Sequence, residues 1–140
     1  MSASEGIRGW HAAIAAGSDP AAIAALVRED AVFHSPVVHT PQRGRTLVTA
    51  YLAAAGQTLG NANFRYVREL IDGDDALLEF ETELDGIHVN GIDLIRFDAE
   101  GMIADFKVMV RPLKAVNAVW EAMAAQLAAA ALRDQAASGS

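Results

Sequence analysis

At 140 residues the chain has the usual length of one domain, and the absence of cysteine excludes a disulfide framework, a thiolate metal site and a cysteine nucleophile. Hydrophobic residues make up 52% and charged residues 21%, which indicates a globular protein and excludes a disordered one. A formal net charge of −7 without a basic cluster argues against nucleic acid as a partner.

The first residues have neither a basic start nor a continuous apolar run, and we identify no apolar stretch of about 18 residues. The sequence therefore predicts a cytoplasmic protein without a membrane span. From about Ser4 to Gly17 the apolar residues share one helical face, which predicts an amphipathic helix that the glycine ends. Its buried side is expected to carry Ile7, Trp10 and Ile14.

A second helix is predicted to open at Ser18-Asp19-Pro20, where capping side chains precede a proline suited to a first turn. Its apolar side is expected to hold Ile23, Leu26 and Val27, and its end is expected near Asp30. The segment 31–35 then predicts a short strand before Pro36 and a loop that contains Pro41 and Gly44. A third helix is predicted over residues 46–59.

From residue 63 the apolar period changes to two, which indicates strands. Four are predicted, over residues 63–71, 76–84, 87–97 and 102–111. Their connections, such as Asp85-Gly86, have the length and composition of hairpin turns, so the strands form an antiparallel meander. Helices followed by hairpins predict an α+β fold in which helices cover one face of a curved antiparallel sheet.

After Pro112 helical spacing returns, and an additional C-terminal helix is predicted over residues 114–133. Its apolar stripe consists of Val116, Trp120, Met123 and Leu127. Such a stripe needs a partner surface, either the open end of the pocket, as a lid, or a second subunit. Residues 1–133 are read as a single domain and residues 134–140 as a frayed tail.

Two segments carry a family resemblance: Glu-Asp-Ala-Val-Phe-His-Ser-Pro at 29–36, and Gly-Ile-Asp-Leu-Ile-Arg-Phe-Asp-Ala-Glu-Gly-Met-Ile at 91–103. With the order of elements, they resemble the nuclear transport factor 2-like superfamily, and within it the SnoaL-like and ketosteroid-isomerase-like branch. The resemblance covers roughly residues 4–112. It implies a cone-shaped fold whose sheet and helices enclose a cavity, and it leaves the function open because this fold hosts enzymes and non-enzymes.

The resemblance also assigns Asp93 to the cavity, because the isomerases keep an aspartic acid at this place protonated and use it as a hydrogen-bond donor to an oxyanion. With Asp93 inward, strand alternation sends the acidic and basic residues of the sheet outward. The inward set is Leu78, Phe80, Thr82, Ile95, Phe97, Phe106, Val108 and Val110, and the outward set is Glu79, Glu81, Glu83, Arg96, Asp105, Lys107 and Arg111.

Other isomerase positions differ in this chain. Ser35 stands where that family has its general-base aspartate, two residues after Phe33 and before a proline, and Trp10 stands where it has its oxyanion-hole tyrosine. A serine hydroxyl cannot abstract a proton unaided, and an indole N–H only donates. Ketosteroid isomerase activity is therefore not expected.

Asp93 remains the best catalytic candidate, because apolar neighbours favour its neutral form; the alternative is a structural carboxyl. Tyr51 is a candidate phenolic donor beside it, or a packing ring, and His39 is a candidate base at the pocket mouth. We expect the remaining pocket lining to come from Trp10, Phe33, Ser35, Leu78, Phe80, Thr82, Ile95, Phe106, Val108 and Val110. No metal-ligand spacing occurs, so neither a metal nor another cofactor is expected.

These residues predict a pocket for a small apolar molecule. The leading hypothesis is an isomerase-, cyclase- or lyase-like enzyme for a carbonyl substrate with Asp93 as acid or oxyanion partner. The alternative is a non-catalytic module for ligand binding or dimerisation. The outer sheet face, with Ile92 and Met109 among its charges, is expected to form a homodimer.

Overall fold

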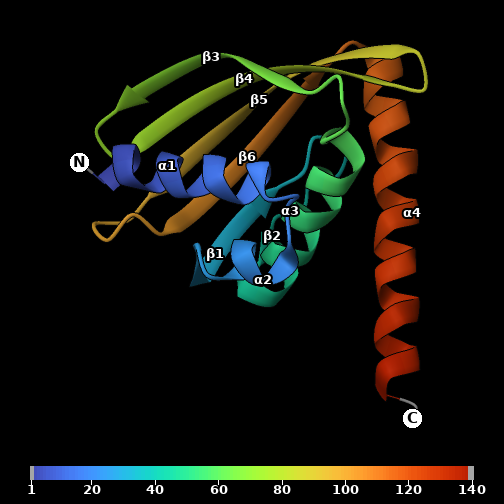
Figure 1. Ribbon diagram of the computed structural model, residues 1–140, viewed down its shortest axis with the longest axis horizontal. Helices are drawn as coiled ribbons and strands as arrows, with labels where there is room; N and C mark the ends of the chain where they lie inside the picture. Colours follow the sequence, from blue (N-terminus) through green and yellow to red (C-terminus); the bar gives the residue numbers. More distant parts are fainter. Residues whose placement is uncertain (1, 139–140) are drawn as a thin grey trace.

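The computed structural model describes residues 2–138, with side chains over residues 3–132. Three short helices lie on one face of a curved sheet, and a long helix stands at the end of the strands and extends past the rest of the domain (Figure 1). The elements are α1 (Ser2–Ala15), α2 (Pro20–Ala24), β1 (Val27–His34), β2 (Gln42–Arg43), α3 (Arg45–Leu59), β3 (Arg65–Asp72), β4 (Asp75–Leu84), β5 (Ile87–Phe97), β6 (Ile103–Arg111) and α4 (Leu113–Ser138).

The sheet has six strands in the order β2-β1-β6-β5-β4-β3. Strands β3 to β6 form the predicted antiparallel meander, and Asp85 and Gly86 both take positive φ in the two-residue turn between β4 and β5. The predicted antiparallel arrangement does not extend to the pairing of β1 with β6, which is parallel. These two strands are far apart in the chain and no hairpin joins them, so neither local turn chemistry nor periodicity reports their pairing.

The second helix ends much earlier than predicted. Asp19 caps it, with Oδ2 accepting a hydrogen bond from the backbone N–H of Ala22 at 3.2 Å, but the helix stops at Ala24 and Val27 already begins β1. The apolar residues around Leu26 fit a helix face and a buried strand equally well, and the strand pairing decides between them. The two-residue strand β2, which pairs with β1, was not predicted.

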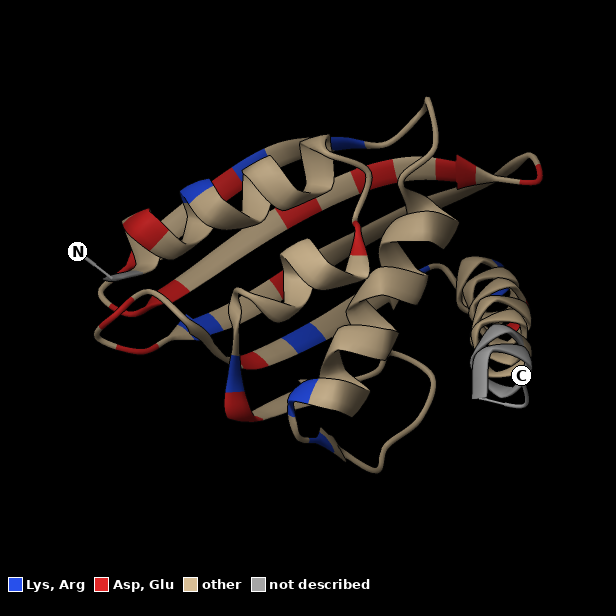
Figure 2. Ribbon diagram, turned by 60° about the horizontal axis from the view of Figure 1, so that its bottom comes forward, with Lys and Arg blue, Asp and Glu red and all other residues tan. Residues whose placement is uncertain are grey.

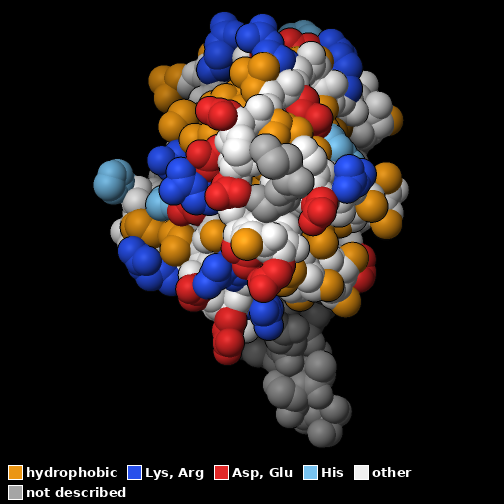
Figure 3. Space-filling model, turned by 90° about the vertical axis from the view of Figure 1, so that its left-hand side faces the viewer, with side chains coloured by type: hydrophobic (Ala, Val, Ile, Leu, Met, Phe, Trp, Pro, Cys, Tyr) orange, Lys and Arg blue, Asp and Glu red, His pale blue; other side chains and the backbone are white. Residues whose placement is uncertain are grey.

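The predicted alternation of the sheet is confirmed. Asp93, Leu78, Phe80, Thr82, Ile95, Phe97, Phe106 and Val108 are buried and Val110 is half-buried. The other face carries charged side chains, and Figure 2 shows acidic and basic residues along the same strands. Several form ion pairs across strands, among them Arg65 with Glu81 at 2.7 Å and Arg96 with Asp75 at 2.9 Å. Figure 3 likewise shows the two signs interspersed on the side of the molecule that it presents.

Helix α4 packs against α3 and the strands β4 to β6. Over residues 113–132, whose side chains the structure describes, the buried residues are Ala115, Val119 and Met123, spaced four apart on one face. The predicted stripe is therefore wrong in part, because Trp120 is 57% exposed within the chain. The helix continues past the predicted end at residue 133 to Ser138. The frayed tail at 134–140 stays a prediction, and residues 139–140 lie outside the described residues.

By length and composition alone, α4 could cross a membrane. Its stretch Leu113–Leu132 has a mean hydropathy of 1.3, so the prediction that no segment is apolar enough is wrong. Core helices of soluble proteins and signal sequences pass the same test, and a single such helix is weak support for a membrane span.

Candidate functional site

A small cavity lies between the concave face of the sheet and the helices α1 and α3. The sheet wall includes Phe80, Asp93, Phe106 and Val108, and the helical wall includes Trp10. The cavity measures about 40 Å³, which holds water but falls far below the roughly 300–1,000 Å³ of pockets for drug-sized ligands. A larger ligand can enter only if a wall moves.

Asp93 is the ionisable carboxyl group of this cavity wall. Its side chain projects from β5 between Leu78 on β4 and Val108 on β6, and the residue is 6% exposed. Burial among apolar neighbours penalises the charged form and raises the pKa of Asp93 to about 7, although a hydrogen bond from Tyr66 lowers it in part. Near neutral pH, the protonated and ionised forms are therefore both populated.

Tyr66 on β3 links Asp93 to α1. The Trp10 Nε1–H donates a hydrogen bond to the Tyr66 hydroxyl at 2.9 Å, and this hydroxyl donates to Asp93 Oδ2 at 3.0 Å. The directions are unambiguous because an indole N–H can only donate, which leaves the single phenolic proton for the carboxyl group. Burial, the largest cause, and the Asp93 charge raise the pKa of Tyr66, so the phenol stays a neutral donor.

Ring contacts hold Tyr66 in this position. Its ring meets Phe64 edge to face at 5.0 Å and the His11 imidazole at 5.4 Å. His11 Nε2 in turn lies 2.8 Å from Glu69 Oε1, so a second polar contact joins α1 to β3. The donor to Asp93 is therefore fixed from both sides.

One oxygen of Asp93 is available to a ligand. Only Oδ2 has a hydrogen-bond partner among the described residues, and the side chain lines the cavity. A protonated Asp93 can donate to a carbonyl or enolate oxygen, and an ionised Asp93 can accept a proton. The site can thus bind a group that accepts hydrogen bonds within apolar walls.

The sequence-predicted site residues fall into two groups. Trp10, Phe80, Asp93, Phe106 and Val108 line the cavity together. Phe33, Leu78 and Ile95 are buried but lie outside the cavity lining, as does Val110, which borders a separate open groove with Ser35 and His39. The ligand-binding role of each residue stays a prediction.

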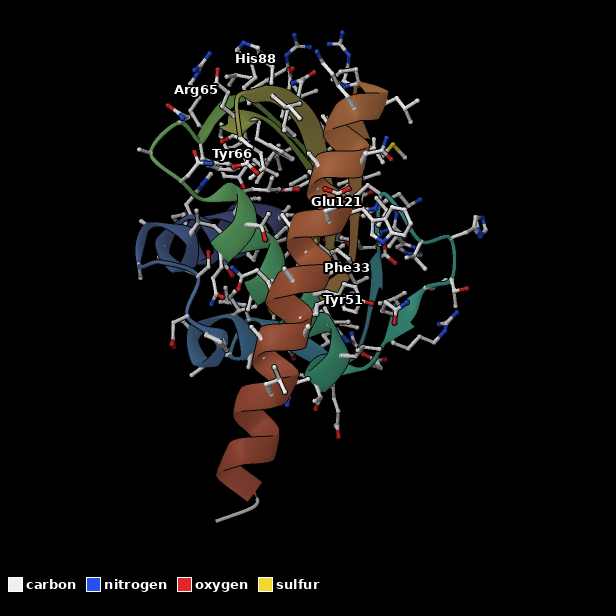
Figure 4. All side chains as sticks on the ribbon, turned by 90° about the vertical axis from the view of Figure 1, so that its right-hand side faces the viewer. Phe33, Tyr51, Arg65, Tyr66, His88 and Glu121 are labelled. Atoms are coloured by element: carbon white, nitrogen blue, oxygen red, sulfur yellow. The ribbon has the colours of Figure 1, made fainter. Side chains whose placement is uncertain are left out.

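The candidate polar partners of Asp93 lie elsewhere. Tyr51 packs on Phe33 with ring centres 5.4 Å apart, and Figure 4 shows this pair well separated from Tyr66. Ser35 Oγ accepts a hydrogen bond from the N–H of Val37 at 3.1 Å and His39 is exposed on the same loop. Thr82 Oγ1 lies 3.3 Å from the Leu59 carbonyl oxygen, within the core. The predicted set therefore contributes Asp93 and Trp10, and no further polar group, to the cavity.

Sequence reasoning missed Tyr66. The available signal was the spacing of Phe64 and Tyr66, two aromatics on one face of a predicted strand, opposite inward-facing Phe80. Among the side chains that the structure describes, no group of three His, Asp or Glu residues could hold a metal ion. None of the described α4 residues lines the cavity either. The helix is thus no lid over this cavity, and its role in assembly stays a prediction.

Comparison with known proteins identifies relatives. Residues 7–106 match the family model described as SnoaL-like domain. A crystal structure of a steroid delta-isomerase from Pseudomonas aeruginosa is 36% identical, with a TM-score of 0.86 over 94% of this chain and 95% of that chain. An uncharacterized protein with a cystatin-like fold from Silicibacter pomeroyi is 38% identical, with a TM-score of 0.73 over 79% of this chain and 77% of that chain.

A third similar structure, an NTF2-like protein from Mesorhizobium loti, is 22% identical with a TM-score of 0.67, over 79% of this chain and 92% of that chain, and it bears on the fold alone. No curated protein matches the chain. The expected superfamily and the cone-like α+β fold are confirmed. The family model ends before α4, as expected, whereas the first structural match covers 94% of this chain and so includes most of α4.

Proposed function

The chain belongs to the SnoaL-like domain family, and on this premise we propose that it is an isomerase-type protein that binds a small apolar carbonyl compound beside Asp93. One observation carries the proposal: a buried carboxyl group with a pKa of about 7 borders an apolar cavity, and its partner is a neutral phenol instead of a cation. A structural carboxyl would be expected to have a cationic partner or several N–H donors.

In this proposal, the protonated form of Asp93 donates a hydrogen bond to the carbonyl oxygen. A water molecule removes the proton beside the carbonyl group, and the electron pair of that C–H bond moves toward the carbonyl oxygen. Negative charge then develops on this oxygen, and a donor in an apolar site stabilises it more strongly than the neutral ketone. Tyr66 keeps the carboxyl group in place through Oδ2 and leaves the other oxygen for the ligand. The similarity to a steroid delta-isomerase over most of the chain supports this type of chemistry.

A second candidate function is ligand binding without turnover. The cavity lining favours this candidate. Among the described residues that line the cavity, Asp93 has the only carboxyl group, so no second side chain is present as a base for the proton beside the carbonyl group. Ser35, at the position of the isomerase base, faces a different groove. The two candidates share the ligand class and differ in proton exchange.

The test uses 2-tetralone, a small apolar ketone with exchangeable protons beside its carbonyl. Binding is measured by calorimetry, and proton exchange is followed by NMR in D2O, for the wild type and for Asp93→Leu. We expect wild type to bind the ketone and to accelerate exchange about 100-fold or more over Asp93→Leu, the range of general acid–base catalysis. Thr58→Val, which removes a buried hydroxyl outside the cavity, is the control.

The pH dependence sharpens this test. A ketone oxygen and a carboxylate both only accept hydrogen bonds, so ionisation of Asp93 removes the donor. The Kd for 2-tetralone should therefore rise about tenfold per pH unit above about 7. Binding that is equally tight in Asp93→Leu contradicts the proposed site, and binding without exchange selects the non-catalytic candidate.

A further inference from the structure

Ser18 brings a second polar group to the wall of the Asp93 cavity. It lies in the turn between α1 and α2 and is 3% exposed, yet it borders the cavity together with Gly56 of α3. The Ser18 side chain has no hydrogen-bond partner among the described residues, since only its backbone N–H is bonded, to the Ala13 carbonyl oxygen at 3.0 Å. A hydroxyl in this position is free for a ligand.

The helix termini around Ser18 do not need its hydroxyl. The sequence pattern predicts Ser18-Asp19 as a source of capping side chains, and the structure uses Asp19 alone for α2. At the end of α1, Gly17 and Ser18 take φ values of 95° and 59°, the left-handed region in which glycine or asparagine is usual. A serine is unfavourable in this backbone conformation, and the turn does not use its hydroxyl group for a hydrogen bond.

The opposite residue makes room for this side chain. A Cβ atom on Gly56 would overlap with Ser18 Oγ and Cβ, so any other residue at position 56 would displace Ser18. Glycine within a helix is itself unfavourable, because it enlarges the entropy loss on folding. Ser18 and Gly56, each unfavourable for its local backbone conformation, therefore face each other at the cavity wall. Residues that are unfavourable for their local structure are expected at functional sites.

Two other buried hydroxyl groups without partners differ from Ser18 in their position relative to the cavity. Thr49 and Thr58 of α3 are also without hydrogen-bond partners, but neither lines the cavity. Ser18 differs from both because it lines the same cavity as Asp93, with Asp93 in the sheet wall and Ser18 in the helical wall. A ligand that enters the cavity, once a wall moves to admit it, has both groups on its lining.

We propose that Ser18 is a specificity-determining residue that binds a second polar group of the ligand, so that the ligand class is a small ketone with a hydroxyl or a second carbonyl on its apolar body. This assignment rests on the proposed function, because Asp93 holds the ketone oxygen. Ser18 can donate to either group and accept from a hydroxyl. It supplies selectivity and takes no part in proton transfer.

The test compares 2-tetralone with its isomers that carry one hydroxyl on the aromatic ring. For wild type, at least one isomer should bind roughly threefold to tenfold more tightly than 2-tetralone, the value of one added hydrogen bond. In Ser18→Ala this ratio should fall to about one, whereas Thr58→Val should keep it. A ratio near one for every isomer in wild type, or a preference that persists in Ser18→Ala, overturns the assignment.

The free protein provides a readout that is independent of ligand. If the Ser18 hydroxyl has no partner, Ser18→Ala should leave the Tm unchanged or raise it; a fall of more than about 3 °C would reveal a structural hydrogen bond and overturn the assignment. Failure of the proposed function looks different: 2-tetralone then binds equally well to Asp93→Leu or does not bind the wild type. In that event, the Tm of Ser18→Ala still decides whether the hydroxyl is free.

Discussion

The substitution Asp93→Asn should make the protein more stable than wild type at alkaline pH. The folded state holds the pKa of Asp93 at about 7, against an ordinary value of 3.8. Because the folded pKa is raised, the folded state binds the proton more tightly, and its contribution to stability is fully present below about pH 4 and is lost as the pH rises to about 7. At about 1.4 kcal/mol per pH unit, the loss amounts to about 4 kcal/mol. This is a large fraction of the roughly 5–15 kcal/mol that stabilises a typical domain.

The assay is urea denaturation followed by tryptophan fluorescence, with the buried Trp10 as a reporter, at pH values from 4 to 8. The asparagine cannot ionise, so the free energy of unfolding of Asp93→Asn minus that of wild type should rise by about 4 kcal/mol over this range. Other titrating groups cancel in the difference.

Asp75→Asn is the matched control. Arg96 donates hydrogen bonds to the Asp75 carboxylate and lowers its pKa, so this group titrates below the ordinary value of 3.8 and its difference curve should be nearly flat above about pH 5. A flat Asp93→Asn curve would mean that folding leaves the pKa of Asp93 unchanged, and a curve that falls with pH would mean that the folded protein stabilises the carboxylate; either result contradicts the raised pKa.

Three other changes test separate parts of the structure. Tyr66→Phe should raise the pKa of Asp93 further, because it removes a hydrogen bond that favours the carboxylate; carboxyl-resolved NMR would contradict this by showing a lower midpoint. Met123→Ala should lower the free energy of unfolding by about 2–4 kcal/mol, since this side chain of α4 is buried; a loss below about 0.5 kcal/mol in urea denaturation would mean that α4 is not packed on the domain. We propose a homodimer through the outer sheet face, where Met109 is 51% exposed, so sedimentation at micromolar concentration should show a dimer that Met109→Glu dissociates. A wild-type monomer would leave that face without the proposed partner.

The sequence predicted the sheet around Asp93 well because period-two alternation and hairpin turns are local signals. The resemblance to the isomerases placed Asp93 inward, although its neighbours Ile92 and Leu94 are the apolar residues of this run, and the charges on neighbouring strands agree with that direction. Once Asp93 pointed inward, the buried positions on β4, β5 and β6 followed. The same local logic placed Trp10 on the buried face of α1.

Pairings and contacts between segments far apart in the sequence could not be predicted from these local signals. The apolar residues around Val27 suit a helix or a strand, and the parallel pairing of β1 with β6 chose the strand. Tyr66 lies on the edge strand β3, where most residues are exposed and the register shifts between Tyr66 and Arg68, so its alternation is weak. The contact with Asp93 appears only when β3, β4 and β5 are assembled side by side.

The hydroxyl and imidazole candidates show the same limit. Ser35 was placed in the pocket from the position of the isomerase base and His39 at its mouth from its loop, but both border a different groove, which shares Val108 with the cavity. Tyr51 was placed from its helix, and packing against Phe33 decides its direction. The position of a residue on a helix limits which residues it can contact, and for Tyr51 the contact with the Phe33 ring decides which way the side chain points.

The most direct test of the account is the titration of the Asp93 carboxyl group, followed by carboxyl-resolved NMR in the free protein and with 2-tetralone. Asp93→Asn identifies the signal by its loss. We expect a midpoint of about 7 in the free protein and a higher midpoint with the ketone, which binds the protonated form. A midpoint at or below about 4, the ordinary value for aspartic acid, would contradict the claim that this carboxyl group is a hydrogen-bond donor to a ligand near neutral pH.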